Sequence, residues 1–338
     1  MGQVKGTEQD YRQIIDGAAI GELAPTVQLA VAGADRASFL QGLLTNDIQA
    51  LAEGSGCYAA WLTPQGRMLT DMHVLESDGM ILLDVPAAQA EATAARLEQF
   101  LFSEDVKIGS LAGALATVWV HGPGAAAALE RSLDGASGLG AWPQYRHAHV
   151  AFAGESLVLV RIDQLAVPGY CAFLSGARHD ELVAALEAAG ARRVDSDALA
   201  AARIEAAYPV FGADMNADTI PLEAGIEPRA ISTTKGCYVG QEVIIRVLHR
   251  GHGRVARRLV TLKLEAPGAE PRSKILAGER EVGFVTSAAV SPASGAVALA
   301  YVHRDLAVEG ASVAVQTPAG PVTGVVVLEP LRQPVWRG

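Results

Sequence analysis

The chain is organised around the stretch KGCYVGQE, residues 235–242, which places one of three cysteines between two glycines. A cysteine reacts as the thiolate, which a nearby cation and the positive end of a helix both favour. Lys235 lies shortly before Cys237, and Gln241 with Glu242 is typical of a first helical turn just after it. The residues alone leave two interpretations open: a reactive or ligand thiol, or the small buried cysteine of a glycine-rich turn.

The same stretch resembles the signature K-G-C-Y-x-G-Q-E of the YgfZ family, bacterial folate-binding proteins related to a mitochondrial iron–sulfur assembly factor. Most of the remaining chain resembles the larger superfamily that contains the T-protein (aminomethyltransferase) of the glycine cleavage system. The resemblance implies a folate-binding body with tetrahydrofolate, or a derivative, as the ligand. It makes Cys237 a candidate functional thiol and Tyr238 a candidate folate contact. The motif residues expected to shape the loop are Lys235, Gly236, Gly240, Gln241 and Glu242.

Composition limits the classes of function. The chain has 338 residues, of which 50% are hydrophobic and 19% charged, a globular composition with room for two or three domains. The formal net charge of −10 argues against strong, sequence-independent binding to nucleic acids, which needs a basic face. The cysteines Cys57, Cys171 and Cys237 lie far apart, which suits a reducing compartment and gives no metal-site spacing. We therefore expect no metal site.

The N-terminal residues and the apolar runs bear on localisation. Residues 1–13 are polar and lack the apolar core of a signal peptide. Gly, Pro or a charged residue interrupts each apolar run before it reaches membrane-spanning length. We expect a cytoplasmic protein that does not contact a membrane.

Two strand–helix patterns occur twice in the same order. The first recurs 89 residues later, and the second recurs at nearly the same offset. The strands are expected at 27–31, 80–85, 118–120 and 170–174, each followed by a helical pattern. The shared offset favours an internal duplication of a split β-α-β unit over unrelated strand–helix pairs. Two such halves packed together would leave a cleft, which is a usual place for a ligand.

A hairpin is predicted between the first pair of strands, with strands at 57–62 and 67–75 joined by a Pro/Gly turn. Asp71 lies in the apolar return strand, where a carboxylate is costly unless it has a partner or a function. An exposed strand position is the alternative. The run 66–75 resembles the T-protein segment G-G-x-x-D-D-L-x-V-Y, with Asp71 at the second aspartate and Thr70 in place of the first. The resemblance implies that Asp71 is catalytic and lies at the folate nitrogens where the one-carbon unit is transferred.

Residues 203–216 form a second segment that resembles the T-protein, through the pattern R-x-E-x-x-x-x-x-x-G-x-D-M. The resemblance implies that Glu205 binds the pterin, with Arg203 beside it. One carboxylate can accept hydrogen bonds from an amino group and a ring N–H that lie side by side. The residues alone favour the alternative, in which Arg203 and Glu205 are a solvated pair on a helix surface. Residues 220–225 also match the superfamily, and Glu223 is a weaker site candidate.

Three departures from the T-protein pattern occur at sites rather than in the core. Residues 161–170 lack the Gly-Glu-Asp segment that contributes to the folate pocket. No Gly-Trp pair precedes the first strand, and the cysteine motif replaces a lysine–aromatic–Gly–Lys/Arg–Glu segment. These differences favour folate binding without aminomethyl transfer.

An arginine-rich run follows the motif, and four of its arginines are spaced four residues apart: Arg246, Arg250, Arg254 and Arg258. Gly251 and Gly253 argue against one continuous helix through them. An anion-binding patch and a charged connector are then equal alternatives.

From residue 258 onward, short alternating runs separated by Gly, Pro and Ser predict a small antiparallel β-barrel. The expected fold class is therefore α+β. A duplicated, ferredoxin-like folate-binding body over residues 1–250 precedes a β-barrel domain over residues 251–338, which helps to close the pocket.

The leading hypothesis is a YgfZ-like tetrahydrofolate-binding accessory factor that supports assembly or repair of iron–sulfur enzymes, including tRNA-modifying ones. In it, Glu205 holds the pterin, Asp71 lies near the folate nitrogens, and Cys237 supplies the thiol at the edge of the cleft. The sequence leaves open whether this thiol is a nucleophile, a transient cluster ligand or a redox sensor, and iron–sulfur client proteins are the expected partners. The alternative is a tetrahydrofolate-dependent one-carbon (aminomethyl) transferase in which Asp71 performs the chemistry, so the sequence leaves open whether the chain is an enzyme. A module that only docks a partner through the arginines is a third hypothesis.

Overall fold

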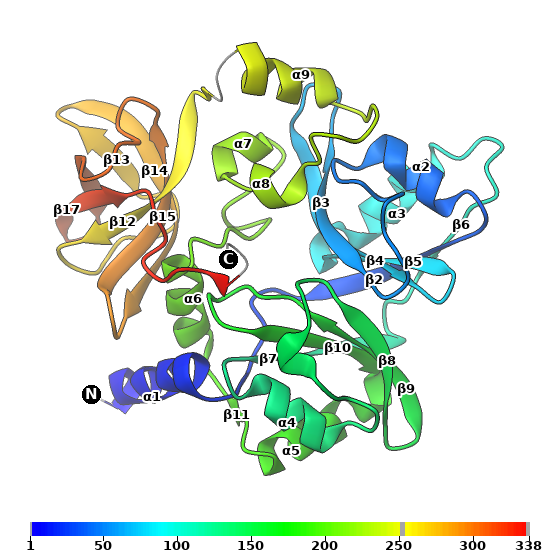
Figure 1. Cartoon of the computed structure of the whole chain (residues 1–338). Coiled ribbons are helices and arrows are strands. Elements are labelled where there is room, and N and C mark those ends of the chain that lie inside the picture. Colours follow the sequence, from blue (N-terminus) through cyan, green and yellow to red (C-terminus); the bar gives the residue numbers. More distant parts are fainter. Residues whose placement is uncertain (1, 251–253, 336–338) are drawn as a thin grey trace.

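The computed structural model describes residues 2–250 and 254–335, and Figure 1 shows its course. Two β-sheets with their helices form a body, and a closed β-barrel lies beside it. The predicted α+β class and the C-terminal antiparallel barrel are both confirmed.

The first sheet has five strands in the order β3-β4-β5-β2-β6. Its strands are β2 (Thr26–Ala32), β3 (Gly56–Leu62), β4 (Met68–Ser77), β5 (Met80–Pro86) and β6 (Lys107–Ser110). Two helices, α2 (Arg36–Leu43) and α3 (Ala90–Glu98), the latter preceded by the 3-10 turn Ala87–Gln89, cover its outer face. Leu40 and Leu97 of these helices share one buried cluster with Val31 and Val74 of the strands.

The second sheet has six strands in the order β11-β1-β7-β10-β9-β8. They are β1 (Ala19–Ile20), β7 (Leu115–His121), β8 (His147–Phe152), β9 (Glu155–Arg161), β10 (Gly169–Ser175) and β11 (Arg192–Arg193). Its outer face is covered by α4 (Ala125–Ser132) and α5 (His179–Ala188), and 3-10 turns occur at Leu139–Ala141 and Gly176–Arg178. Leu129, Leu182 and Leu159 belong to the buried cluster that joins these helices to the sheet.

The two sheets are copies of one unit. The order β3-β4-β5-β2 in the first corresponds to β8-β9-β10-β7 in the second, and all of these pairs are antiparallel. The strands β2 and β7 begin 89 residues apart, at Thr26 and Leu115, as do β5 and β10, at Met80 and Gly169. The predicted duplication therefore agrees with the topology.

The inner faces of the two sheets pack against each other. Leu75 and Leu82 of the first sheet share a buried cluster with Trp119, Val158 and Phe173 of the second. The body therefore has four layers, with helices outside and two sheets inside, and any cavity at the sheet interface is shielded from solvent on both sides.

A set of short helices connects the body to the barrel. It comprises α6 (Ser196–Glu205), α7 (Pro221–Ala224), α8 (Glu227–Ala230), α9 (Gln241–Ile245) and a π-helical turn, η4 (Arg246–Arg250). The N-terminal helix α1 (Gly2–Asp16), which the sequence patterns did not predict, lies against α6. Asp195 caps α6, since its side chain accepts a hydrogen bond from the backbone N–H of Ala198.

The barrel closes in the order β12-β15-β14-β13-β16-β17. Its strands are β12 (Arg257–Leu264), β13 (Lys274–Ala277), β14 (Arg280–Ser291), β15 (Gly295–His303), β16 (Ser312–Thr317) and β17 (Gly320–Val327). Alternate residues such as Val260, Leu262, Val313 and Val315 fill the interior. β14 contacts α6, so the barrel is attached to the body through this helix.

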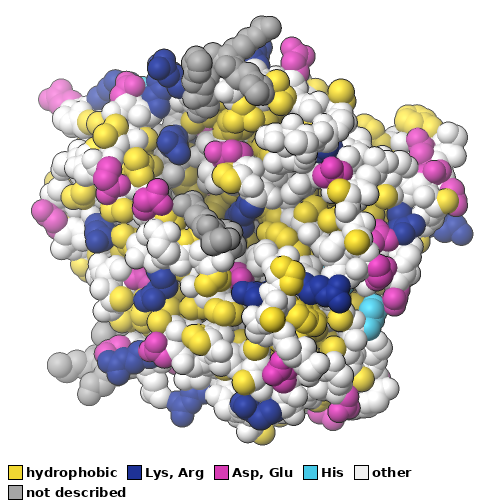
Figure 2. All heavy atoms as spheres, viewed as in Figure 1, with side chains coloured by type: hydrophobic (Ala, Val, Ile, Leu, Met, Phe, Trp, Pro, Cys, Tyr) yellow, Lys and Arg dark blue, Asp and Glu magenta, His cyan; other side chains and the backbone are white. Residues whose placement is uncertain are grey.

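Charged side chains are mixed on the surface. On the face in Figure 2, Lys and Arg side chains are interspersed with Asp and Glu instead of forming one basic area. Of the arginine run, Arg246 lies in η4 and Arg258 in β12, while Gly251 and Gly253 fall outside the described residues. Within the described part of the chain, no helix has the length and apolar character needed to cross a bilayer.

Candidate functional site

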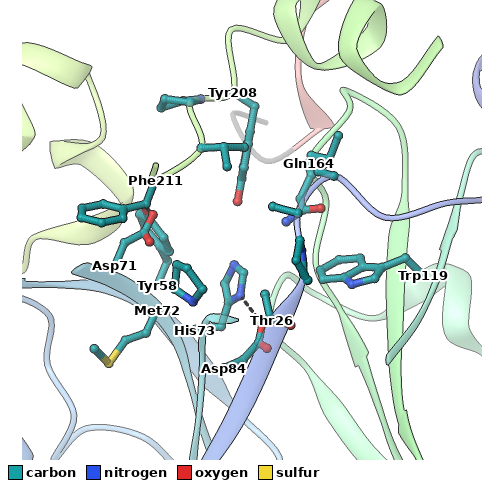
Figure 3. A pocket seen from close by; sticks show the side chains of 16 residues that line it. Thr26, Tyr58, Asp71, Met72, His73, Asp84, Trp119, Gln164, Tyr208 and Phe211 are labelled. Atoms are coloured by element: carbon teal, nitrogen blue, oxygen red, sulfur yellow. Dashed lines mark hydrogen bonds and ion pairs between the residues drawn. The ribbon is translucent and has the colours of Figure 1, made fainter. Parts of the chain in front are cut away.

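A cavity of about 60 Å³ lies where the two halves of the body meet (Figure 3). The first sheet contributes Tyr58, Asp71 and His73, and the second half contributes Trp119 and Gln164. Residues 208–211, just after α6, complete the lining. The cleft predicted between the duplicated halves is therefore present, and Asp71 lies in it.

A row of polar side chains crosses four strands of the first sheet. Tyr58 on β3 pairs with His73 on β4, His73 with Asp84 on β5, and Asp84 with Gln28 on β2. Directly paired residues project to the same face of a sheet, and this face is the one that lines the cavity. The corresponding positions in the second sheet are His149, Val158, Phe173 and Thr117, so the two central strands carry apolar side chains where the first sheet carries His73 and Asp84.

Asp71 has one hydrogen-bond donor inside the cavity. Asp71 is only 8% exposed, and the Tyr58 hydroxyl donates a hydrogen bond to Asp71 Oδ2 at 2.6 Å. Burial raises the pKa of Asp71 above its ordinary value, and the hydrogen bond from Tyr58 opposes this shift. The exposed-strand alternative is wrong, and the group can carry a proton nearer to neutrality than an ordinary aspartate.

Arg229 lies between two tyrosine rings beside the cavity. Its guanidinium carbon is 4.4 Å from the centre of the Tyr58 ring and 4.2 Å from that of Tyr208. Such stacking stabilises a cation between aromatic faces. A second cavity of about 370 Å³, lined by Tyr208, Pro209, Pro228 and Arg229, adjoins the first across Tyr208 and Pro209.

Glu205 and Arg203 are both buried, so the solvated-pair alternative is wrong. The Glu205 carboxylate accepts hydrogen bonds from Tyr11 at 2.5 Å, Ser291 at 2.5 Å and Ser294 at 2.6 Å. These contacts join α6 to α1 and to the barrel, and Glu205 is not part of the lining of either cavity. Arg203 pairs with Asp214 at 2.5 Å, also outside the lining.

Lys235 fixes the cysteine loop to the body instead of approaching Cys237. Its Nζ donates to the backbone carbonyls of Gln41 and Leu44 at 2.6 Å and of Asn46 at 2.9 Å. These carbonyls lie at the end of α2, where a cation is favourable. Burial lowers the pKa of Lys235 to about 8.

Gly240 allows the loop to approach the β3–β4 hairpin. Its φ is +87°, and a Cβ atom there would lie 2.5 Å from the carbonyl oxygen of Thr63. Tyr238 is buried in the cluster that includes Ile244, and its burial raises the pKa of this phenol to about 12. Tyr238 is therefore a packing residue of the loop and does not line the cavity.

The other motif residues face outward or make few contacts. Cys237 is exposed, which contradicts the buried-cysteine alternative, and it does not line the cavity. A Cβ added to Gly236 would have no atom within 4 Å, and Gln241 and Glu242 begin α9. The motif thus contains anchoring residues and one exposed thiol.

Two further expectations concern other charged groups. The weaker candidate Glu223 pairs with Arg257 at 3.2 Å and so links α7 to the first barrel strand. Within residues 2–250 and 254–335, no three His, Cys, Asp or Glu side chains are grouped as a metal site would require.

Several residues of the site were not predicted from the sequence, among them Tyr58, His73, Tyr208 and Arg229. A signal existed for His73, which follows Asp71 at the period-two spacing that places both on one face of a strand. No local pattern indicated the stack of Tyr58, Arg229 and Tyr208, because these residues come from three distant segments.

Comparisons with known proteins agree with this architecture. A family model described as "GCVT N-terminal domain" matches residues 3–235, and one described as "Glycine cleavage T-protein C-terminal barrel domain" matches residues 257–332. The aminomethyltransferase T of Bartonella henselae has the same fold, with a TM-score of 0.84 and 21% identity over 97% of this chain and 90% of that chain.

Relatives by sequence carry similar names. An aminomethyltransferase of Rubrobacter xylanophilus is 29% identical over 89% of this chain and 80% of its own length. A putative chloroplastic transferase of Arabidopsis thaliana is 28% identical over 89% of this chain and 68% of its own length. These names support the transferase hypothesis better than the accessory-factor hypothesis. With both family models matched in order over most of its length, the chain belongs to the glycine cleavage T-protein family.

Proposed function

We propose that this protein binds tetrahydrofolate at the interface of its two halves and acts as a one-carbon transferase of the aminomethyltransferase type. The observation that carries the proposal is Asp71, a buried carboxylate that accepts a hydrogen bond from Tyr58 within a cavity. The family supplies the reaction class, and the raised pKa of Asp71 suits a group that exchanges a proton with a ligand nitrogen.

The two cavities would divide the ligand between them. The ring system would enter the cavity at Asp71, and the acidic tail would lie in the second cavity, where Arg229 offers a cation. The first cavity, at about 60 Å³, is far smaller than typical ligand pockets of roughly 300–1,000 Å³. Binding therefore requires a lining side chain to move, and Tyr208 is the residue that separates the two cavities.

Asp71 would act as a general acid and base. In its protonated form it gives a proton to the departing amine of an aminomethyl donor. In its ionised form it stabilises the positive charge that develops on the one-carbon unit as it passes to the folate nitrogen. A carboxyl group that populates both forms near neutrality is suited to this exchange.

Calorimetric titration of tetrahydrofolate, with an assay of ammonia release from an aminomethyl donor, tests the proposal. We expect wild type to bind, Asp71→Asn to bind without releasing ammonia, and Arg229→Gln to bind about tenfold more weakly through loss of a charged contact. Glu281→Gln, at an exposed glutamate of the barrel outside both cavities, is the matched control, and Glu205→Gln tests the pterin-binding role that the resemblance implies. Normal ammonia release by Asp71→Asn would contradict the catalytic role of Asp71. Loss of tetrahydrofolate binding in Glu205→Gln alone would show that Glu205, not the Asp71 cavity, binds the pterin.

A second candidate function is the YgfZ-like accessory role in iron–sulfur enzyme assembly or repair, and the exposure of Cys237 within KGCYVGQE favours it. Lys235, Tyr238 and Gly240 have packing roles, whereas the exposed thiol has none that accounts for its presence. Complementation of a strain that lacks the endogenous factor distinguishes the two functions. Cys237→Ser should fail to restore the iron–sulfur enzymes, and Cys57→Ser, at a shielded thiol whose pKa burial raises to about 12, should restore them.

A further inference from the structure

His73 is held in a fixed orientation by two buried residues of neighbouring strands. Its Nδ1 lies 3.0 Å from Asp84 Oδ2, and Gln28 Nε2 donates to Asp84 Oδ1 at 2.9 Å. The exposed fractions are 6% for His73, 1% for Asp84 and 2% for Gln28. Both carboxylate oxygens are thus occupied, and the carboxylate can only be an acceptor for Nδ1.

This arrangement decides which nitrogen of His73 is available. Because Nδ1 carries the hydrogen that Asp84 accepts, neutral His73 presents a bare Nε2. Nε2 is buried and has no hydrogen-bond partner among the described residues, and His73 lines the cavity. A buried polar atom without a partner is uncommon in folded proteins and indicates a missing donor. Figure 3 shows the ring directed into the same space as Tyr208 and Asp71.

We propose that His73, oriented by Asp84 and Gln28, is a second proton-accepting group of this cavity and a catalytic residue beside Asp71. The inference rests on the proposed function, because it takes the ligand to be a reduced folate with N–H groups. The T-protein segment that Asp71 matches leaves the position of His73 free, so the resemblance gives His73 no role.

The step is a single proton transfer. A ligand N–H bond breaks, its electron pair stays on the ligand nitrogen, and the proton forms a new bond to Nε2. The imidazolium is stabilised by Asp84, as in other His–carboxylate pairs. The ionisable groups around His73 are Asp71 on β4, Tyr58 on β3, Asp84 on β5, Tyr145 before β8 and Tyr208, which lines the same cavity; Arg229 on α8 stacks on Tyr58 and Tyr208. After product leaves, the proton returns to solvent.

The test is ¹⁵N NMR of histidine-labelled wild-type protein during titration with tetrahydrofolate. We expect one histidine Nε2 signal to move from the position of a bare ring nitrogen toward that of a hydrogen-bonded or protonated one. His73→Asn should remove that signal, and it should lower kcat/KM by about 100-fold, within the range of general-base catalysis. His149→Asn makes the same change at an exposed histidine outside the cavity and should leave both measurements unchanged.

A second variant tests orientation separately from chemistry. Asp84→Asn can donate to Nδ1, which would place the hydrogen on Nε2 and remove the acceptor. We expect it to lower kcat/KM to a similar extent while tetrahydrofolate still binds. If His73→Asn does not fold, the wild-type spectrum still tests the role of His73. Tetrahydrofolate binding without a change in any histidine nitrogen signal would overturn that role and leave the proposed function intact. Absence of binding by the wild-type protein would overturn the proposed function, and this inference with it.

Discussion

Burial of Asp71 makes its ionised form costly, and the hydrogen bond from Tyr58 compensates only in part. The pKa of the folded state therefore lies above the ordinary value of 3.8. Between pH 3.8 and the raised pKa of the folded state, Asp71 is ionised in the unfolded chain but protonated in the folded one. The free energy of unfolding therefore falls as the pH rises through this interval. A residue that destabilises the protein at neutral pH is retained more readily for function than for folding.

Replacement of Asp71 by Asn should separate the two effects. An amide keeps an acceptor for Tyr58 and does not ionise, so we expect a larger free energy of unfolding than wild type at pH 7. The difference should disappear below about pH 3.8, the ordinary value, and ammonia release should fall by at least ~100-fold. Urea denaturation at several pH values measures the stability. An unchanged or reduced stability at pH 7 would show that Asp71 is not penalised by burial.

Replacement of Tyr58 by Phe should raise the pKa of Asp71 further, because it removes the donor that favours the carboxylate. The pH dependence of kcat should shift to higher pH accordingly. Tyr238→Phe is the matched control, since that buried hydroxyl has no hydrogen-bond partner within the described residues and lies outside the cavity. A profile that stays at the wild-type position would separate Tyr58 from the titrating group.

At the scale of elements, the cysteine loop is held by contacts to α2 and to the β3–β4 hairpin. Lys235 occupies three carbonyl oxygens near the end of α2, and Gly240 packs against Thr63. The loop is therefore positioned by distant parts of the chain. Lys235 is separated in sequence from its partners Gln41, Leu44 and Asn46 by 194, 191 and 189 residues.

Lys235→Met should leave those carbonyls without their donor. We expect a loss of about 1–3 kcal/mol in the free energy of unfolding, the usual cost of unsatisfied buried polar groups. Lys263→Met, at an exposed position of β12, should change stability by less than about 0.5 kcal/mol. Equal effects of the two substitutions would remove the anchoring role of Lys235.

Gly240→Ala should be costly because the backbone is left-handed there and the new methyl group would meet Thr63. We expect about 1–3 kcal/mol of destabilisation. Gly236→Ala is the matched control within the same motif, since no atom lies within 4 Å of its Cβ position. Chemical denaturation of both variants should separate them clearly, and similar values would show that the loop adjusts freely.

The strands and the duplication could be predicted because they depend on local alternation and on a repeated offset. Asp71 could be identified as unusual because a carboxylate in an apolar strand needs a partner. The hydrogen bonds of Glu205 could not be predicted, because its donors are distant in sequence: Tyr11 lies in α1, and Ser291 and Ser294 lie in the barrel. The strands β6, β8, β9 and β13 and the two-residue strands β1 and β11 were not predicted.

At the scale of the whole molecule, Glu205 and Arg203 connect the body to the barrel. Glu205 accepts from two serines at the end of β14, and Arg203 donates to Ser287 at 2.8 Å. These polar contacts, together with the buried packing of Ile204 against Val297 and Leu299, set the position of the barrel strands relative to α6. A second link, the Glu223–Arg257 pair, joins α7 to β12, so the barrel can affect ligand binding through either contact.

Glu205→Ala should weaken this junction. Three hydroxyl groups would lose their acceptor, and we expect a loss of about 2–4 kcal/mol together with faster proteolysis between body and barrel. Glu281→Ala removes an exposed glutamate of the barrel that pairs with Lys274, and it should have little effect. Limited proteolysis followed by mass analysis of the fragments provides the measurement, and an unchanged cleavage pattern would contradict this role.

Because the two sheets of the body have the same strand order, the side chains at corresponding positions can be compared directly. Where the first sheet carries Tyr58, His73, Asp84 and Gln28, the second carries His149, Val158, Phe173 and Thr117. The first sheet supplies Tyr58, Asp71, His73 and Asp84 to the cavity, whereas the second sheet contributes the ring of Trp119. All the ionisable side chains that the two sheets give to the cavity thus come from the first sheet. A substitution in the second sheet should therefore alter the shape of the cavity rather than its charge.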